Sequence, residues 1–176
     1  MELLSVGDTI RVADGDTARI RWIGKRSVVS LFSGAHPVRV ATGALGENLP
    51  IRDLCLSPDH ALLLSGVLVQ ASALVNGTTI TRMTDLPEHF TYHHVGIEGH
   101  RLLLAEGVPA ETFVDNVTRR RFDNYAGYEA LYGDLSTAIA EMNLPRVKSA
   151  RQVPRALRER IAARAAELGF GKAPAA

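Results

Sequence analysis

The chain has 176 residues, of which 46% are apolar and 22% are charged, so it is long enough to bury a hydrophobic core of its own. Its single cysteine, Cys55, excludes intrachain disulfides and a cysteine-rich zinc site. The longest uncharged apolar run, residues 61–68, is far shorter than the roughly 20 residues that a membrane span requires. Residues 1–5 lack the features of a secretory signal. The compartment is therefore unknown from the sequence, and the cytoplasm is the default expectation.

Charge is distributed unevenly along the chain, although the formal net charge is only +1. Residues 146–172 contain eight basic and two acidic residues, and the remainder contains 12 basic and 17 acidic residues. This asymmetry predicts an acidic body followed by a basic tail. The tail is either a solvated helix or a contact surface for an acidic partner, nucleic acid or a membrane surface.

The first part of the chain, up to about residue 115, has the pattern of short strands separated by turns. Residues 17–24 alternate between polar and apolar side chains, which is typical of a half-buried strand. The apolar residues 61–64 and 67–69 flank Ser65-Gly66, a sequence that favours a tight hairpin turn. We therefore expect an antiparallel hairpin there.

Three further elements continue this β pattern. Residues 74–80 surround Asn76-Gly77, which predicts a second tight hairpin. Residues 91–97 alternate as a strand does, and residues 102–105 form another apolar run before the turn at Glu106-Gly107. The expected fold class is mainly β.

The chain changes character after residue 116, where alanine, leucine, glutamate and arginine become frequent. Residues 125–142 and 154–168 are predicted helices. Pro154 suits the first position of the second helix and Gly169 suits its end. The apolar stripe that should pack inward, with the arginines outside, consists of Leu157, Ile161, Ala165 and Leu168.

A short polar element precedes the predicted hairpin. Ser57 lies three residues before His60, at the start of an apolar strand. Such a spacing can place a hydroxyl and an imidazole beside one peptide bond, where His60 protonates a departing backbone nitrogen and Ser57 orients it. The alternative is an ordinary turn in which Ser57 and Asp59 hydrogen-bond to nearby backbone.

Histidines and the cysteine are the other candidates for chemistry. His93 and His94 should point to opposite faces of one strand, so they cannot both face one site. A metal site that combines His60 with two histidines or acids of residues 93–100 has no diagnostic spacing, so we expect no metal and no cofactor. Cys55, between two leucines of a predicted strand, is expected to be a buried, unreactive thiol.

Several stretches of the chain match one family in their order and approximate spacing. They are residues 6–15, 21–26, 37–46, 52–62, 74–77, 92–100 and 103–113. Together they resemble bacterial Hint (hedgehog/intein) domains over roughly residues 2–122. The resemblance implies a disc-shaped, mainly β Hint-like domain with a pseudo-twofold arrangement over residues 1–122. Residues 123–176 would then be a helical, basic C-terminal extension.

The resemblance also implies an activity, the self-catalysed cleavage known from protein splicing and autoproteolysis. A Cys or Ser attacks the carbonyl of the residue before it, and the resulting (thio)ester is resolved by a second nucleophile. The substrate would be the chain's own N-terminal flanking polypeptide. Ser57 and His60 match the family's Thr-x-x-His element, with serine in place of threonine, and His100 resembles a histidine of a later block.

Two departures from the family pattern concern the reacting groups. Residues 1–8 match a stretch that follows the nucleophile strand in the family, and Ser5 lies inside that stretch. We therefore expect the nucleophile to be missing from these 176 residues. Either they are part of a longer chain that carries the nucleophile upstream, or they are a degenerate, inactive member of the family. Glu111 and Thr112 stand near the positions of the terminal His-Asn of inteins, so release through asparagine cyclisation is not expected.

Other functional classes remain open from the sequence. The chain could be a non-enzymatic binding or scaffold module that contacts a protein partner through its basic helix. Nucleic acid is a disfavoured partner, because residues 146–172 contain only one aromatic residue, Phe170, for stacking on bases. A His/Glu metal hydrolase ranks last among these hypotheses.

Overall fold

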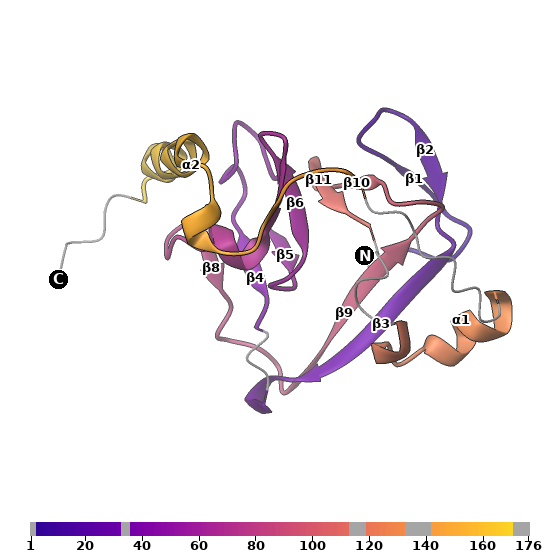
Figure 1. The fold of residues 1–176 in the computed structure, drawn as a ribbon. Coiled ribbons are helices and arrows are strands. Elements are labelled where there is room, and N and C mark those ends of the chain that lie inside the picture. The colour runs from indigo at the N-terminus through magenta and orange to yellow at the C-terminus, as the bar shows by residue number, and fades with distance from the viewer. Residues whose placement is uncertain (1–2, 33–35, 113–118, 133–141, 171–176) are drawn as a thin grey trace. The chain divides into compact units, whose positions relative to one another are not determined.

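The computed structural model describes residues 3–32, 36–112, 119–132 and 142–170. The chain forms two compact units that are interleaved in sequence, and Figure 1 shows their elements. Unit 1 consists of Met1–Gly34, Leu86–Leu103 and Glu111–Asn143. Unit 2 consists of Ala35–Asp85, Leu104–Ala110 and Leu144–Ala176.

Unit 1 is built on two antiparallel strand pairs. Strands β1 (Thr9–Arg11) and β2 (Thr17–Arg19) form a short hairpin. Strands β3 (Trp22–Val29) and β9 (His89–Gly96) pair along their whole length and form the long ribbon seen in Figure 1. The strand predicted for residues 91–97 is thus confirmed, and the one predicted for 17–24 is divided between β2 and β3.

Apolar side chains from these strands form the core of unit 1. Its buried members are Val12, Ile20, Ile23, Val95 and Ile97. A second cluster forms where the helix α1 (Tyr125–Tyr132) approaches the start of β3. There the Trp22 ring contacts Phe122 and Tyr128 at centroid distances of 5.0 and 5.3 Å, in edge-to-face geometry. The predicted helix 125–142 is confirmed as far as Tyr132, and residues 133–141 lie outside the described residues.

The segment before α1 covers the outer edge of β3. It follows the short 3-10 helix η3 (Arg119–Arg121). Asn124 Oδ1 accepts the N–H of Lys25 at 2.9 Å, and Asp123 Oδ2 accepts the N–H of Ser27 at 2.7 Å. The N–H of Asp123 donates in turn to the carbonyl of Lys25 at 2.8 Å. These bonds satisfy an edge that could otherwise pair with another strand.

Unit 2 contains most of the short strands. A three-stranded sheet has the order β5 (Leu54–Leu56), β4 (Val38–Val40), β8 (Ile80–Arg82). A five-stranded sheet has the order β10-β11-β6-β7-β12, in which β12 pairs parallel with β7. Its strands are β10 (Leu102–Ala105), β11 (Val108–Glu111), β6 (Ala61–Leu64), β7 (Val67–Gln70) and β12 (Arg146–Val147). Strands β10 and β11 each belong partly to unit 1.

The two glycine-containing turns predicted next to these strands have the positive φ values expected of tight hairpin turns. Ser65 and Gly66 have φ values of 52° and 79°, and they join Leu64 of β6 to Val67 of β7. Glu106 and Gly107, with φ of 48° and 82°, occupy the turn between β10 and β11. Two successive residues with positive φ match the twist of antiparallel strands. Both predicted turns are confirmed.

The hairpin predicted around Asn76-Gly77 is wrong. The residues before it form a 3-10 helix, η2 (Ala71–Leu74), and the strand β8 begins only at Ile80. Gly77 alone of the pair has a positive φ, 76°. The Asn76 side chain accepts the N–H groups of Thr78 and Ile80 at 3.0 and 2.9 Å, and so replaces a strand partner with a side-chain turn.

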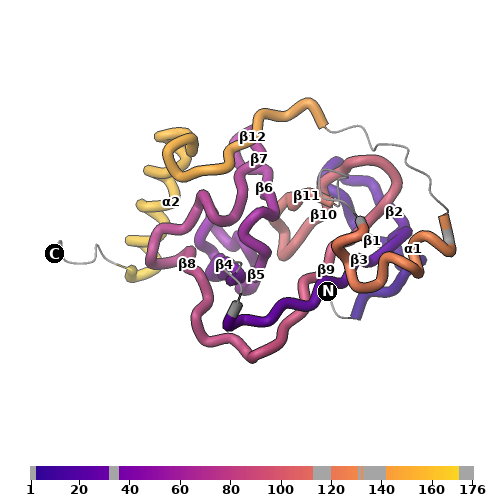
Figure 2. The backbone as a smooth tube through the Cα atoms, turned by 60° about the horizontal axis from the view of Figure 1, so that its bottom comes forward, coloured from indigo at the N-terminus to yellow at the C-terminus, as the bar shows by residue number. Residues whose placement is uncertain are grey.

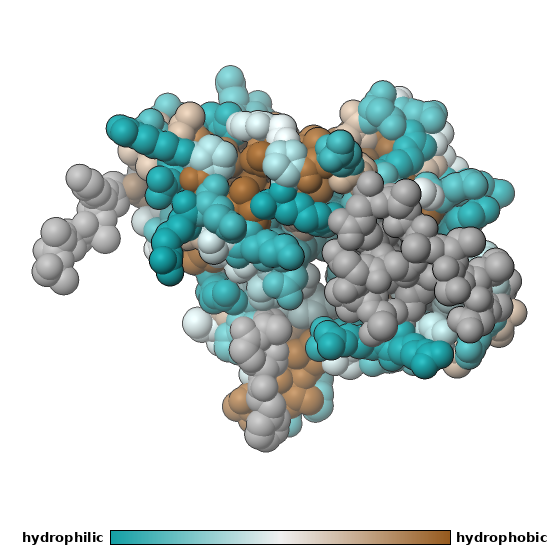
Figure 3. All heavy atoms as spheres, viewed as in Figure 1, coloured by the Kyte–Doolittle hydropathy of each residue, from teal (hydrophilic) through white to brown (hydrophobic). Residues whose placement is uncertain are grey.

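The helix α2 (Arg155–Glu167) packs within unit 2, where Figure 2 shows it beside strands of the unit. Pro154 is its N-cap rather than its first residue, and Gly169, with φ of 82°, follows its end. The predicted stripe is confirmed, because Leu157, Ile161 and Ala165 are buried and Leu168 is half-buried. Arg164 Nε also donates to the carbonyl of Gly43 at 2.8 Å. In Figure 3 the atoms at the position of α2 are mostly hydrophilic.

The elements as a whole confirm a mainly β fold with a short C-terminal helix. The 3-10 helix η4 (Ala150–Gln152) precedes α2. Another 3-10 helix, η1 (Ser30–Phe32), follows β3. None of the helices in the described residues is both long enough and apolar enough to cross a membrane. The division of the chain at residue 122 stays a prediction, and the structure assigns α1 to unit 1 and α2 to unit 2.

Candidate functional site

The Ser57–His60 element forms the turn between β5 and β6 in unit 2. The N–H of His60 donates to the carbonyl of Ser57 at 3.1 Å, which closes the turn. Both residues are half-buried, whereas Pro58 between them is buried and Asp59 is exposed. The structure therefore brings the predicted hydroxyl and imidazole residues onto one tight turn that solvent can reach.

Two backbone hydrogen bonds pin this turn to η2. The N–H of Ala71 donates to the carbonyl of His60 at 2.9 Å, and the N–H of Ser72 donates to the carbonyl of Pro58 at 2.9 Å. Leu56 before the turn and Leu62 after it are both buried. The backbone under Ser57 and His60 is thus fixed from both sides, which is the preorganisation that proton transfer to a nearby peptide group requires.

His100 belongs to unit 1, whereas Ser57 and His60 belong to unit 2. Its side chain is only 1% exposed, and its Nε2 lies 2.9 Å from Oε1 of Glu111, whose side chain is 11% exposed. The backbone N–H of Met142 donates to Nδ1 of the same ring at 2.9 Å. His100 is therefore a buried imidazole with a polar neighbour at each nitrogen.

The contact with Met142 indicates the tautomer of His100. Because Nδ1 accepts an N–H, that nitrogen carries the lone pair and Nε2 carries the proton of the neutral ring. The Nε2–H makes no well-aligned hydrogen bond, although the Glu111 oxygen lies at ion-pair distance.

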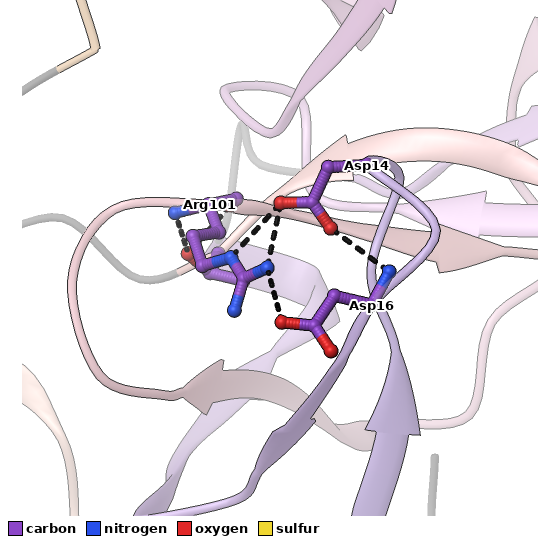
Figure 4. Close-up of polar contacts among 4 residues, drawn as sticks. Asp14, Asp16 and Arg101 are labelled. Atoms are coloured by element: carbon purple, nitrogen blue, oxygen red, sulfur yellow. Dashed lines mark hydrogen bonds and ion pairs between the residues drawn. The ribbon is translucent and has the colours of Figure 1, made fainter.

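Arg101, the residue after His100, joins this region to the β1–β2 turn (Figure 4). Its Nη2 lies 2.6 Å from Oδ2 of Asp14 and 3.3 Å from Oδ2 of Asp16. The hydrogen bond from Arg101 and the N–H of Asp16 lower the pKa of Asp14 below its ordinary value. Thr112 Oγ1 donates to the Arg101 carbonyl at 2.8 Å, so the segments that carry His100 and Glu111 are tied together.

The partners of His100 and Arg101 are not evident from the sequence. Glu111 and Thr112 stand out in the sequence only because they lie near the positions of the intein His-Asn pair. The Asp14-Gly15-Asp16 triplet next to a strand was the one available signal, but its arginine lies 87 residues further along the chain.

Cys55 is exposed, which corrects the expectation of a buried thiol. In β5, Leu54 and Leu56 are buried and Cys55 alternates to the outer face. Partial desolvation and the nearby Asp53 carboxylate raise the pKa of the Cys55 thiol, while Arg39 opposes them. Asp53 itself accepts the N–H of Thr42 at 2.9 Å and pairs with Arg39 Nη2 at 2.6 Å. The thiol therefore stays protonated and is a poor nucleophile.

Metal ligation finds no support in the described part of the chain. No group of three or more His, Cys, Asp or Glu side chains there is arranged to hold a metal ion. Strand β9 ends at Gly96, so His94 and His100 do not share one strand face.

Comparisons with known proteins give a family for the chain and a similar solved structure. A family model described as "Hint domain" matches residues 1–117. A solved structure titled "Crystal structure of MchDnaB-1 intein" is similar over 62% of this chain and 86% of that chain, with 15% sequence identity and a TM-score of 0.41. No curated protein matches the chain.

Proposed function

We propose that this chain, which belongs to the Hint domain family, assists the cleavage of the peptide bond that joins it to its own N-terminal flanking polypeptide. In the reaction, the sulfur or oxygen of a Cys or Ser attacks the preceding carbonyl carbon. The carbon–nitrogen bond breaks, a (thio)ester forms and the departing nitrogen takes up a proton. The (thio)ester is then resolved by a second nucleophile.

The turn that carries Ser57 and His60 is the observation on which the proposal depends. His60 would give the proton to the departing backbone nitrogen, and the Ser57 hydroxyl would hold that peptide group by a hydrogen bond. The hydrogen bonds from η2 to the carbonyls of Pro58 and His60 keep the turn in place during the reaction. His100 is a third candidate, as a proton carrier within unit 1.

None of residues 1–176 is assigned the role of nucleophile. Ser5 lies in the stretch that follows the nucleophile in the family, and the raised pKa of Cys55 opposes its use. The 176 residues by themselves are therefore expected to leave their peptide bonds intact. The nucleophile would therefore belong to the N-terminal flanking polypeptide.

The test is the intact mass of an extended protein, in which a reporter domain and a short segment with a Cys nucleophile precede residue 1. Cleavage into two masses, accelerated by dithiothreitol, supports the proposal. His60→Ala should slow cleavage at least tenfold, because general acid–base catalysis typically contributes about 10²–10⁴-fold. Ser57→Thr should retain activity and Ser57→Ala should lose much of it.

The matched control is His89→Ala, which removes an exposed histidine of β9. It should cleave as the unaltered protein does, and all variants should keep their far-UV circular dichroism. Equal rates for His60→Ala and His89→Ala would remove His60 from the mechanism. An unaltered extended protein that stays whole would refute the autoprocessing function.

A second candidate function is binding of an acidic protein partner through α2. The first turn of α2 holds no acidic residue, and Arg151, Arg155 and Arg158 are exposed on or near it. Binding of a glutamate-rich peptide that weakens with salt and is lost on replacing these arginines by alanine would support it. Cleavage by the extended protein distinguishes this function from the first.

A further inference from the structure

We propose that Glu111 is a positioning residue for His100, holding the proton on Nε2 so that Nδ1 is the nitrogen that takes up a proton. The inference rests on the proposed function, in which His100 is a candidate proton carrier, and it names Glu111 as the residue that prepares His100 for this role. Glu111 is a buried acidic residue to which the mechanism above gives no role.

The burial of the pair is the first argument. The His100 side chain is 1% exposed and the Glu111 side chain 11%, and the facing atoms Nε2 and Oε1 are 2.9 Å apart. Charged carboxylates are rarely buried to this extent without a partner. A charge-assisted contact in a low-dielectric setting is also stronger than one in water.

The second argument is the division of tasks between the two ring nitrogens. Nδ1 accepts the Met142 N–H, so the proton of the neutral ring is on Nε2, facing the Glu111 carboxylate. A carboxylate behind an imidazole fixes the tautomer and stabilises the imidazolium that forms when the other nitrogen is protonated. The carboxylate itself stays ionised.

Proton uptake at Nδ1 has a structural consequence at Met142. A protonated Nδ1 is a donor, so it cannot continue to accept the Met142 N–H. One proton enters at Nδ1, the Met142 hydrogen bond opens, and the ring carries a positive charge that Glu111 balances. When Nδ1 gives this proton up, the ring is neutral again and can accept the Met142 N–H as in the structure.

The third argument is the rigidity of the backbone beside the pair. Thr112, next to Glu111, donates through both its N–H and its hydroxyl to the carbonyl of Arg101, at 3.2 and 2.8 Å. Arg101 is in turn held by Asp14, as Figure 4 shows. His100 and Glu111 therefore have neighbouring residues that are joined directly, which limits how far the two side chains can separate.

The first experiment measures solvent exchange of the His100 Nε2 proton by ¹⁵N-resolved NMR on the 176-residue chain. Glu111→Gln keeps the size of the side chain but removes its charge, and it should exchange this proton at least tenfold faster. Glu111→Asp should recover part of the protection. Glu129→Gln, which removes an exposed carboxylate of α1, is the control and should behave as the unaltered chain does.

The second experiment measures cleavage by the extended protein with the same variants. Glu111→Gln should slow cleavage at least tenfold, Glu111→Asp should restore part of the rate, and Glu129→Gln should have no effect. Unchanged exchange or unchanged cleavage in Glu111→Gln would overturn the inference. If the unaltered extended protein never cleaves, the proposed function fails, and the exchange measurement still decides whether Glu111 holds the Nε2 proton.

Discussion

Leu157→Ala tests whether α2 is an integral part of unit 2. Leu157 is 2% exposed and lies on the same helix face as the buried Ile161 and Ala165. The substitution removes three buried carbon atoms, worth roughly 0.8 kcal/mol each in transfer free energy. The remaining cavity adds to this, so the free energy of unfolding should fall by about 3 kcal/mol.

Urea unfolding followed by circular dichroism measures this change. With a slope of about 2 kcal/mol per molar urea, the midpoint should fall by roughly 1.5 M. Arg158→Ala, one residue further along and exposed, is the control and should change stability by less than about 0.5 kcal/mol. If Leu157→Ala shifts the midpoint no more than Arg158→Ala does, α2 is a solvated extension and its packing stripe has no energetic role.

Two further predictions concern the loops of unit 2 and a glycine pair. The Thr42 N–H lowers the pKa of Asp53, so the ionised carboxylate stabilises the fold above the ordinary aspartate range, and this contribution is lost as pH falls through the lowered pKa. Asp53→Asn should therefore weaken the pH dependence of the free energy of unfolding below about pH 4, and it should also speed alkylation of Cys55. A free energy of unfolding that depends on pH as in the unaltered chain would contradict this. Gly107→Ala should lower the free energy of unfolding by about 1 kcal/mol or more, because φ is 82° and a Cβ would lie 2.9 Å from a neighbouring leucine carbon. Gly127→Ala, where a Cβ in α1 would meet open space, should raise it by about 0.5–1 kcal/mol. Thermal unfolding measures both changes, and the reverse order would refute the reasoning.

Local signals predicted the elements whose structure depends on a few adjacent residues. Ser65-Gly66 and Glu106-Gly107 form the turns expected of them, because positive φ values are available there at low cost. The apolar stripe of α2 also lies as its period predicts. Asn76-Gly77 failed as a hairpin because the asparagine side chain, rather than a partner strand, bonds the backbone that follows.

In the candidate site, too, the sequence indicates the residues that are close in the chain and not the contacts between distant ones. Ser57 and His60 are three residues apart, so one turn suffices to bring them together, and the sequence alone could single them out. His100 could be named, but its carboxylate partner could not, since the approach of Glu111 depends on how β10 and β11 fold back. The exposure of Cys55 likewise depended on which face of β5 the sheet buries.

By itself, the sequence determined the mainly β class, the family resemblance, the turn with Ser57 and His60 and the amphipathic helix at the end, because each is encoded in short-range pattern. Only the tertiary structure decided that β3 pairs with β9, that Arg101 binds Asp14, and that His100 is buried against Glu111. These contacts join residues up to 87 positions apart. Their formation depends on strand register and on the burial of shared apolar surface, which no local pattern of residues specifies.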